Sequence, residues 1–209
     1  MVVRLAEALE VPLRERNVML LAAGYAPAYP ETSFDDPRLG PVRNALEGVL
    51  DGHRPYPAAI TDRHGHLVSA NDSVAMLFEG VDPSLLTAPV NLARVLLHPG
   101  GVAPRILNLQ EWGWHVLDGL HRKAQRNADE RLEALARELE PYVPARPRHS
   151  PQDLGFAVPL RLRADGHELS LMTTLAHFAT AIDVTIAELT LEAFLPASAP
   201  TAAFFTVRS

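Results

Sequence analysis

The chain has 209 residues, 47% hydrophobic and 21% charged, which is enough for one medium-sized domain with a small accessory part. It contains no cysteine, so disulfides, thiolate metal ligands, cysteine nucleophiles and a flavin–cysteine adduct are excluded. The formal net charge of −6 argues against a nucleic-acid-binding surface. With no apolar run of about 18 residues and no signal-peptide pattern at its start, the sequence predicts a cytoplasmic protein without a membrane span.

The N-terminal quarter is expected to be helical. Residues 1–27 should form two short helices, the second ending at Gly24, which suits the C′ position. Residues 28–56 should form a connecting loop and then a helix. Its start is marked by Asp36 as a capping residue, followed by Pro37 at the first helical position.

Residues 60–80 predict a hairpin followed by a helix. Asp62 begins a tight turn in which Gly65 can adopt the positive φ that such turns need. Asn71 lies where the N-cap of the following helix is expected. Behind it an apolar stripe begins at Val74.

The middle of the chain predicts helices. A short apolar segment covers residues 92–97, and a long helical stretch runs from about 109 to 140 with a break near 127–129. Residues 141–151 carry four prolines and are expected to form a linker-like loop.

The last third changes to an alternating period. Residues 158–163, 169–177 and 189–195 predict three strands, with a turn at residues 164–166. Two strands, then helices, then three strands predict an α+β fold, namely a PAS-like five-stranded antiparallel sheet with helices over one face.

Three parts of the chain carry a resemblance to a known family. The order of Asp62, Gly65, Asn71, Leu77 and Gly80 resembles the opening of a PAS-type sensor, although an ordinary hairpin followed by a helix also fits these residues. Residues 4–27 resemble the end of the helical DNA-binding domain of XRE-family (Cro/repressor-like) bacterial regulators. Residues 89–112 and 182–198 resemble the C-terminal domain that often follows it, the MmyB-like, PAS-type ligand-binding domain.

The resemblance implies an effector-sensing transcription regulator whose sensor domain holds a small, largely apolar ligand. A long-chain fatty acid is the ligand associated with one branch of the family. It also implies a division into residual helix-turn-helix residues 1–27, a connection at 28–56, a PAS-like domain at 57–198 and a tail at 199–209. The recognition helix of the family lies before the point where this chain begins. We therefore expect either a truncated piece or the product of a late start codon, and no residue here is assigned to DNA.

A homodimer is expected, because operator-reading regulators commonly act as symmetric dimers and the N-terminal helices carry many leucines.

The segment 98–108 contains the most promising polar residues. His98, Arg105 and Asn108 stand among apolar neighbours, and polar groups in such a setting need partners. Either they tie the loop to the sheet through backbone hydrogen bonds, or Arg105 meets the polar end of a ligand, since its guanidinium suits a carboxylate. The full candidate ligand-binding set adds residues from the next helix and from the middle C-terminal strand: Leu96, His98, Arg105, Ile106, Asn108, Trp112, Leu171, Thr173, Leu175 and His177.

Metal binding and catalysis find little support in the sequence. His64 and His66 are expected to be separated by the turn at Gly65, with no third ligand at a familiar spacing, and Glu111 with His115 lacks a further ligand. No serine lies in a glycine-flanked elbow, so no catalytic residue is assigned and no cofactor is implied. Besides a ligand sensor, the sequence leaves open a dimerisation module without a ligand and a hydrolase of acyl compounds.

Overall fold

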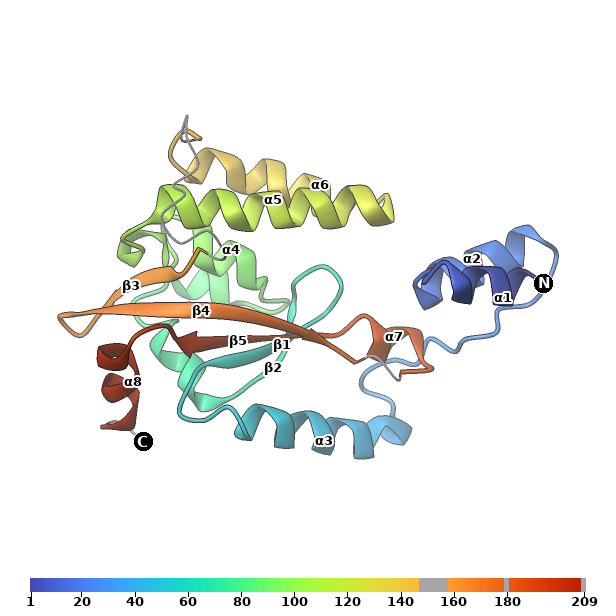
Figure 1. Ribbon diagram of the computed structural model, residues 1–209, viewed down its shortest axis with the longest axis horizontal. Coiled ribbons are helices and arrows are strands. Elements are labelled where there is room, and N and C mark those ends of the chain that lie inside the picture. The colour runs from blue at the N-terminus through green and yellow to red at the C-terminus, as the bar shows by residue number, and fades with distance from the viewer. Residues whose placement is uncertain (147–157, 179–180, 208–209) are drawn as a thin grey trace.

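The computed structural model describes residues 1–146, 158–178 and 181–207. They contain a five-stranded antiparallel sheet in the order β2-β1-β5-β4-β3 (Figure 1). The α+β, PAS-like fold expected from the sequence is confirmed. The strand bounds are β1 Ala58–Thr61, β2 Leu67–Ala70, β3 Leu160–Ala164, β4 His167–His177 and β5 Thr190–Pro196.

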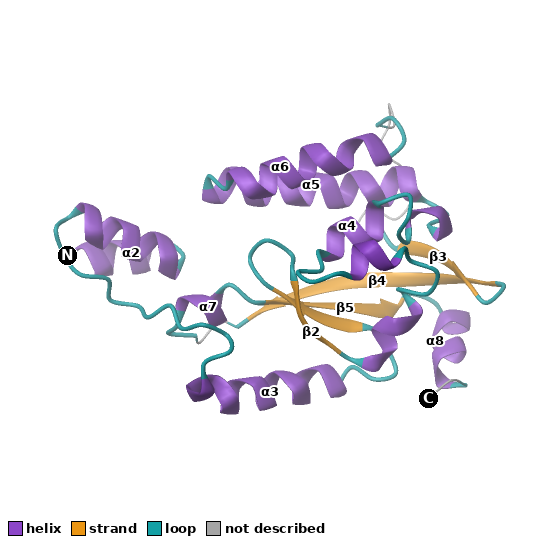
Figure 2. Ribbon diagram, turned by 180° about the vertical axis from the view of Figure 1, so that it is seen from behind, coloured by secondary structure: helices purple, strands orange, loops and turns teal. Residues whose placement is uncertain are grey.

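Helices cover both faces of the sheet. Helices α4, α5 and α6 lie over one face and α3 lies against the other, while α1 and α2 stand apart beyond α7 (Figures 1 and 2). The helix bounds are α1 Val2–Ala8, α2 Leu13–Ala22, α3 Gly40–Asp51, α4 Leu92–Leu97, α5 Leu109–Asn127, α6 Glu130–Leu139, α7 Val184–Ala187 and α8 Ala199–Thr206.

Each face of the sheet has its own apolar core, because successive strand residues point to opposite faces. On the α5 side Ala59 and Phe194 are buried with the leucines of β3. On the α3 side Ile60 and Leu191 are buried against that helix. Two residues of β5 that face the α5 side are polar instead, namely Thr190 and Glu192.

The β1–β2 hairpin forms as the sequence predicts. Gly65 adopts φ +82° in the turn, and Asp62 Oδ1 accepts hydrogen bonds of 2.8 Å from the amides of His64 and His66. Both interactions stabilise one turn geometry.

Asn71 lies at the N-cap position that the sequence predicts, but it has a different role there. Its side chain makes no capping bond, and the segment behind it is a 3₁₀ turn at Asp72–Met76. Asn71 is buried, accepts from the amide of Ala58 and donates to the carbonyls of Leu50 and Tyr56. A side chain that can both accept and donate joins the end of α3 to β1, which is a long-range role that a local pattern does not reveal.

The break between the long helices falls where the sequence predicts it. Ala128 adopts φ +48°, and Asp129 caps α6 by accepting from the amides of Arg131 and Leu132. Of the expected linker at 141–151, residues 147–151 lie outside the described residues.

Two helices were not anticipated. Helix α7 begins after Asp183, whose carboxylate accepts from the amides of Thr185 and Thr32. Helix α8 occupies residues expected to form a tail, and its Phe205 is buried beside Tyr56.

Candidate functional site

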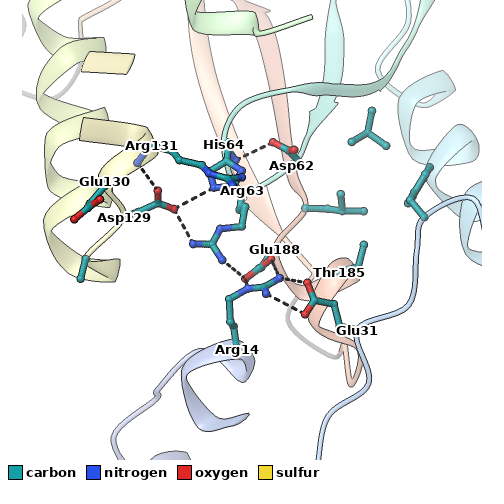
Figure 3. Close-up of a pocket in the computed structure, with 14 residues that line it drawn as sticks. Arg14, Glu31, Asp62, Arg63, His64, Asp129, Glu130, Arg131, Thr185 and Glu188 are labelled. Carbon is teal, nitrogen blue, oxygen red and sulfur yellow. Dashed lines mark hydrogen bonds and ion pairs between the residues drawn. The ribbon is translucent and has the colours of Figure 1, made fainter. Parts of the chain in front are cut away.

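A polar cavity of about 750 Å³ lies between the β1–β2 hairpin, the α5–α6 corner and the N-terminal helices (Figure 3). Its charged lining comes from elements far apart in the sequence: Arg14, Glu31, Asp62, Arg63, Asp129, Glu130, Arg131 and Glu188. Among these, five acidic residues face three arginines, so the lining carries a formal charge of −2. Such a lining suits small cationic or polar groups rather than an apolar chain.

The charges in this cavity form a continuous chain of contacts. Arg14 contacts Glu188 at 2.6 Å, and Glu188 lies 3.5 Å from Arg63. Arg63 in turn lies 2.7 Å from Asp129, whose other near neighbour is His64 Nε2 at 3.2 Å. The chain therefore links α2, the end of α7, the hairpin and the N-terminus of α6 (Figure 3).

The ionisation of these groups follows from their contacts. Hydrogen bonding to Glu188 raises the pKa of Arg14 despite the opposing effect of burial. Burial alone would raise the pKa of Asp129, but the hydrogen bonds from Arg63 and from the Leu132 amide outweigh it and the pKa is lowered. These two groups are therefore charged at neutral pH and hold the cavity wall together.

A second cavity, of about 560 Å³, lies beside α8 and is lined in part by Met76 and Phe205. Arg54 and Asp72 pair across its rim at 3.0 Å. None of the ten predicted ligand-binding residues lines either of these two cavities.

Four of the predicted ligand-binding residues are core residues. Leu96, Ile106, Trp112 and Leu171 are all at most 6% exposed and belong to the cluster between the sheet and α4–α6. The structure thus brings them together as expected, in contact with protein on all sides.

The polar residues of segment 98–108 bind the backbone. Arg105 donates to the carbonyls of Met76 and Leu77. Asn108 donates to the carbonyl of Pro159 at 2.8 Å and accepts from the amide of Arg161 at 3.0 Å. These contacts correspond to the first of the two alternatives drawn from the sequence, in which the segment is tied to the rest of the fold.

His98 is likewise engaged locally. Its Nδ1 accepts from the amide of Gly100 at 2.9 Å, and its ring packs edge-on against Tyr142 with centroids 4.8 Å apart.

The remaining three predicted residues lie on β4 on the α5 side of the sheet, next to Glu192. Leu175 is paired with Glu192 across the β4–β5 ladder, and alternation places Thr173 and His177 on the same face. We call these four residues, Thr173, Leu175, His177 and Glu192, the sheet strip. Leu175 is 62% exposed, although the residues on the same face of the sheet further along, such as Leu171, are fully buried.

The sheet strip contains polar groups with few partners. The hydroxyl oxygen of Thr173 is buried without a hydrogen-bond partner among the described residues. Glu192 receives one long bond, from the Thr61 hydroxyl at 3.4 Å. Burial raises the pKa of Glu192, and the field of Lys123 on α5 opposes this shift.

Lys123 was not singled out as a site residue from the sequence. It is partly buried, and within the described chain its ammonium makes no ion pair within 4.0 Å. Burial lowers its pKa, while Glu192 is the first of the charges that raise it. It is the only lysine among 19 basic residues, and this was the one signal in the sequence that could have pointed to it.

The five-stranded antiparallel sheet and the helices packed on it define a PAS-like α+β domain. The family model of the MmyB-like transcription regulator ligand binding domain matches residues 42–206. The chain belongs to this family. A comparison with curated proteins found no match. Among the described residues no helix is long and apolar enough to span a membrane.

Proposed function

We propose that this chain is the effector-sensing part of a bacterial transcription regulator and that its ligand binds on the sheet strip beneath α5. The observation that carries the proposal is the match of residues 42–206 to a regulator ligand-binding domain. The exposed Leu175, on the same face of β4 as the buried Leu171, supports the location.

The chemistry of this surface favours a ligand with an apolar body and one acidic end. Leu175 offers apolar contact, and Thr173 offers a hydroxyl that has no hydrogen-bond partner in the described part of the chain. Lys123 supplies a cation that forms no ion pair with the residues the structure describes, whereas Arg105 is occupied by two carbonyls. A long-chain fatty acid has this composition, and it is the ligand we propose.

Binding of a fluorescent long-chain fatty acid to Lys123→Gln tests the location. We expect affinity about 10- to 100-fold weaker, as for the loss of one hydrogen bond to a charged group. Arg122→Gln is the matched control, because Arg122 is the exposed neighbour of Lys123 on α5. Equal affinity of the two variants would show that Lys123 does not contact the ligand.

Two other functions compete with this one. A dimerisation module would have a stable fold and bind no fatty acid, and a hydrolase would release product from acyl esters. In the polar cavity Glu188 and Asp129 are paired with Arg14 and Arg63, so these two carboxylates are not free to act as nucleophiles, which disfavours the hydrolase. A screen with acyl esters addresses it directly.

The DNA-reading role is proposed for the regulator as a whole. Helices α1 and α2 resemble the closing helices of an XRE-type domain, and their arginines are balanced by glutamates, so the chain alone should not bind duplex DNA specifically. Tight binding of this chain to the region upstream of its own gene, at moderate salt, would contradict this.

Homodimer formation through α1 and α2 is part of the proposal. Leu5, Leu9 and Leu21 are 53%, 65% and 58% exposed, and an exposed apolar surface of this kind commonly contacts a second chain. Light scattering at about 100 μM, where even micromolar association is visible, should report the mass of two chains.

A further inference from the structure

The β1–β2 turn gathers three potential metal ligands that the sequence suggested would stay apart. One donor atom from each of Asp62, His64 and His66 lies within 4.8 Å of the others. The expectation that the turn at Gly65 separates the two imidazoles is therefore wrong, because the turn brings a donor atom of each close to the other and to the Asp62 carboxylate. Two imidazoles and one carboxylate are a donor set for divalent first-row transition metals.

The turn that carries these ligands is held in place by several backbone contacts. Asp62 donates from its amide to the carbonyl of His66 at 2.9 Å, and Gly65 donates to Asp62 at 3.1 Å. From outside the turn, Asn91 donates to the carbonyl of His64 at 2.9 Å. A fixed backbone reduces the entropy lost when the side chains converge on an ion.

The distance between two of the three donors fits a metal ion with little movement, and a donor atom of His64 lies within 4.8 Å of both. Two ligands at tetrahedral positions around Zn²⁺ are about 3.4 Å apart, given metal–ligand bonds of about 2.1 Å. His66 Nδ1 and Asp62 Oδ2 are 3.0 Å apart, so an opening of a few tenths of an ångström would admit the ion between them. Asp62 keeps its other oxygen, Oδ1, for the two turn amides.

A carboxylate behind His64 completes the arrangement. Asp129 Oδ2 lies 3.2 Å from His64 Nε2. The carboxylate of Asp129 also accepts hydrogen bonds from Arg63 and from the backbone amides at the start of α6. Metal-binding histidines commonly have such an outer carboxylate, which fixes the ring and leaves the second ring nitrogen for the metal.

We propose that Asp62, His64 and His66 bind one divalent transition-metal ion such as Zn²⁺. Asp129 acts as the positioning carboxylate for His64. This site lies at the edge of the polar cavity and uses no residue of the sheet strip, so metal binding can be tested without the proposed effector.

Calorimetric titration of the metal-free, tag-free chain with Zn²⁺ tests the proposal, with Co²⁺ absorption spectra as a check on coordination. We expect one ion per chain with micromolar affinity. His66→Gln and His64→Gln should each weaken binding about tenfold or more, in line with the effect of removing groups that support a metal site. His115→Gln, at an exposed histidine on α5, is the matched control and should bind as the unaltered chain does.

Circular dichroism of each variant separates loss of a ligand from loss of the fold. The proposal would be overturned if no binding were detected up to about 1 mM Zn²⁺, a concentration far above the micromolar dissociation constant expected. Undiminished affinity in both folded variants, or a loss in His115→Gln equal to theirs, would also overturn it.

Discussion

Arg14 in α2 and Glu188, the residue after α7, form a two-point ion pair, with Nε and Nη2 of the guanidinium 2.6 and 2.8 Å from the carboxylate oxygens. The same guanidinium contacts Glu31 in the connecting loop. Through Glu188 the pair also reaches Arg63, so the N-terminal helices are joined to the sensor domain by charge–charge contacts.

Removing this pair should loosen the N-terminal helices. For Arg14→Gln we expect the free energy of local opening of α2 to fall by about 1–2 kcal/mol. This is less than buried hydrogen bonds between charged groups contribute, because the pair is partly exposed to solvent. Amide hydrogen exchange across α2 measures it. Arg4→Gln, at an exposed arginine of α1, is the control. Equal protection of α2 in both variants would mean that the pair contributes nothing.

Asn71 should be one of the most sensitive polar positions. Asn71→Ala leaves the Ala58 amide and two carbonyls without their partner in a buried place, which should lower the free energy of unfolding by about 2–4 kcal/mol. Denaturant unfolding gives this value. Asn44→Ala, exposed on α3, should change it by about 0.5 kcal/mol or less.

Arg105 and Lys123 should respond in opposite ways. Arg105→Ala removes two hydrogen bonds to the backbone and should lower the melting temperature while leaving the fatty-acid affinity of the folded protein unchanged. Lys123→Gln should weaken binding without a comparable loss of thermal stability. Thermal melts and binding isotherms on both variants are needed, and weaker binding by a fully stable Arg105→Ala would restore Arg105 as the ligand anchor.

Glu192 should make stability depend on pH. Burial raises its pKa, so the folded state holds the proton more tightly than the unfolded state does. Its contribution is favourable below the unfolded pKa of about 4.3 and is lost as pH rises through the higher folded pKa. Glu192→Gln should therefore raise the melting temperature at neutral pH and change it little below about pH 4. Glu47→Gln, exposed on α3, is the control, and an identical shift in both variants would contradict a role for burial.

The sequence predicted the elements whose signals are local. Gly65 in the turn, Asp36 at the cap of the 3₁₀ turn that leads into α3, and the break near Ala128 all act within a few residues. The alternation in the last third of the chain likewise predicted strands where β3, β4 and β5 lie.

The features that the sequence did not predict depend on contacts between distant segments. Asn71 serves α3 and β1 together, and Phe205 is buried only because α8 returns to Tyr56. The same holds for the candidate site, since Lys123 gains its importance from Glu192, which lies 69 positions further along the chain. Spacing along one element does not reveal such pairs.

The central claim is that the chain binds a small molecule with an apolar body and an acidic end. Native mass spectrometry of the purified protein, before and after extraction with organic solvent, tests it most directly. The account predicts an added mass on the native protein that disappears on extraction and is restored by a long-chain fatty acid. A bare protein mass in both samples, with no uptake of the added fatty acid, would contradict it.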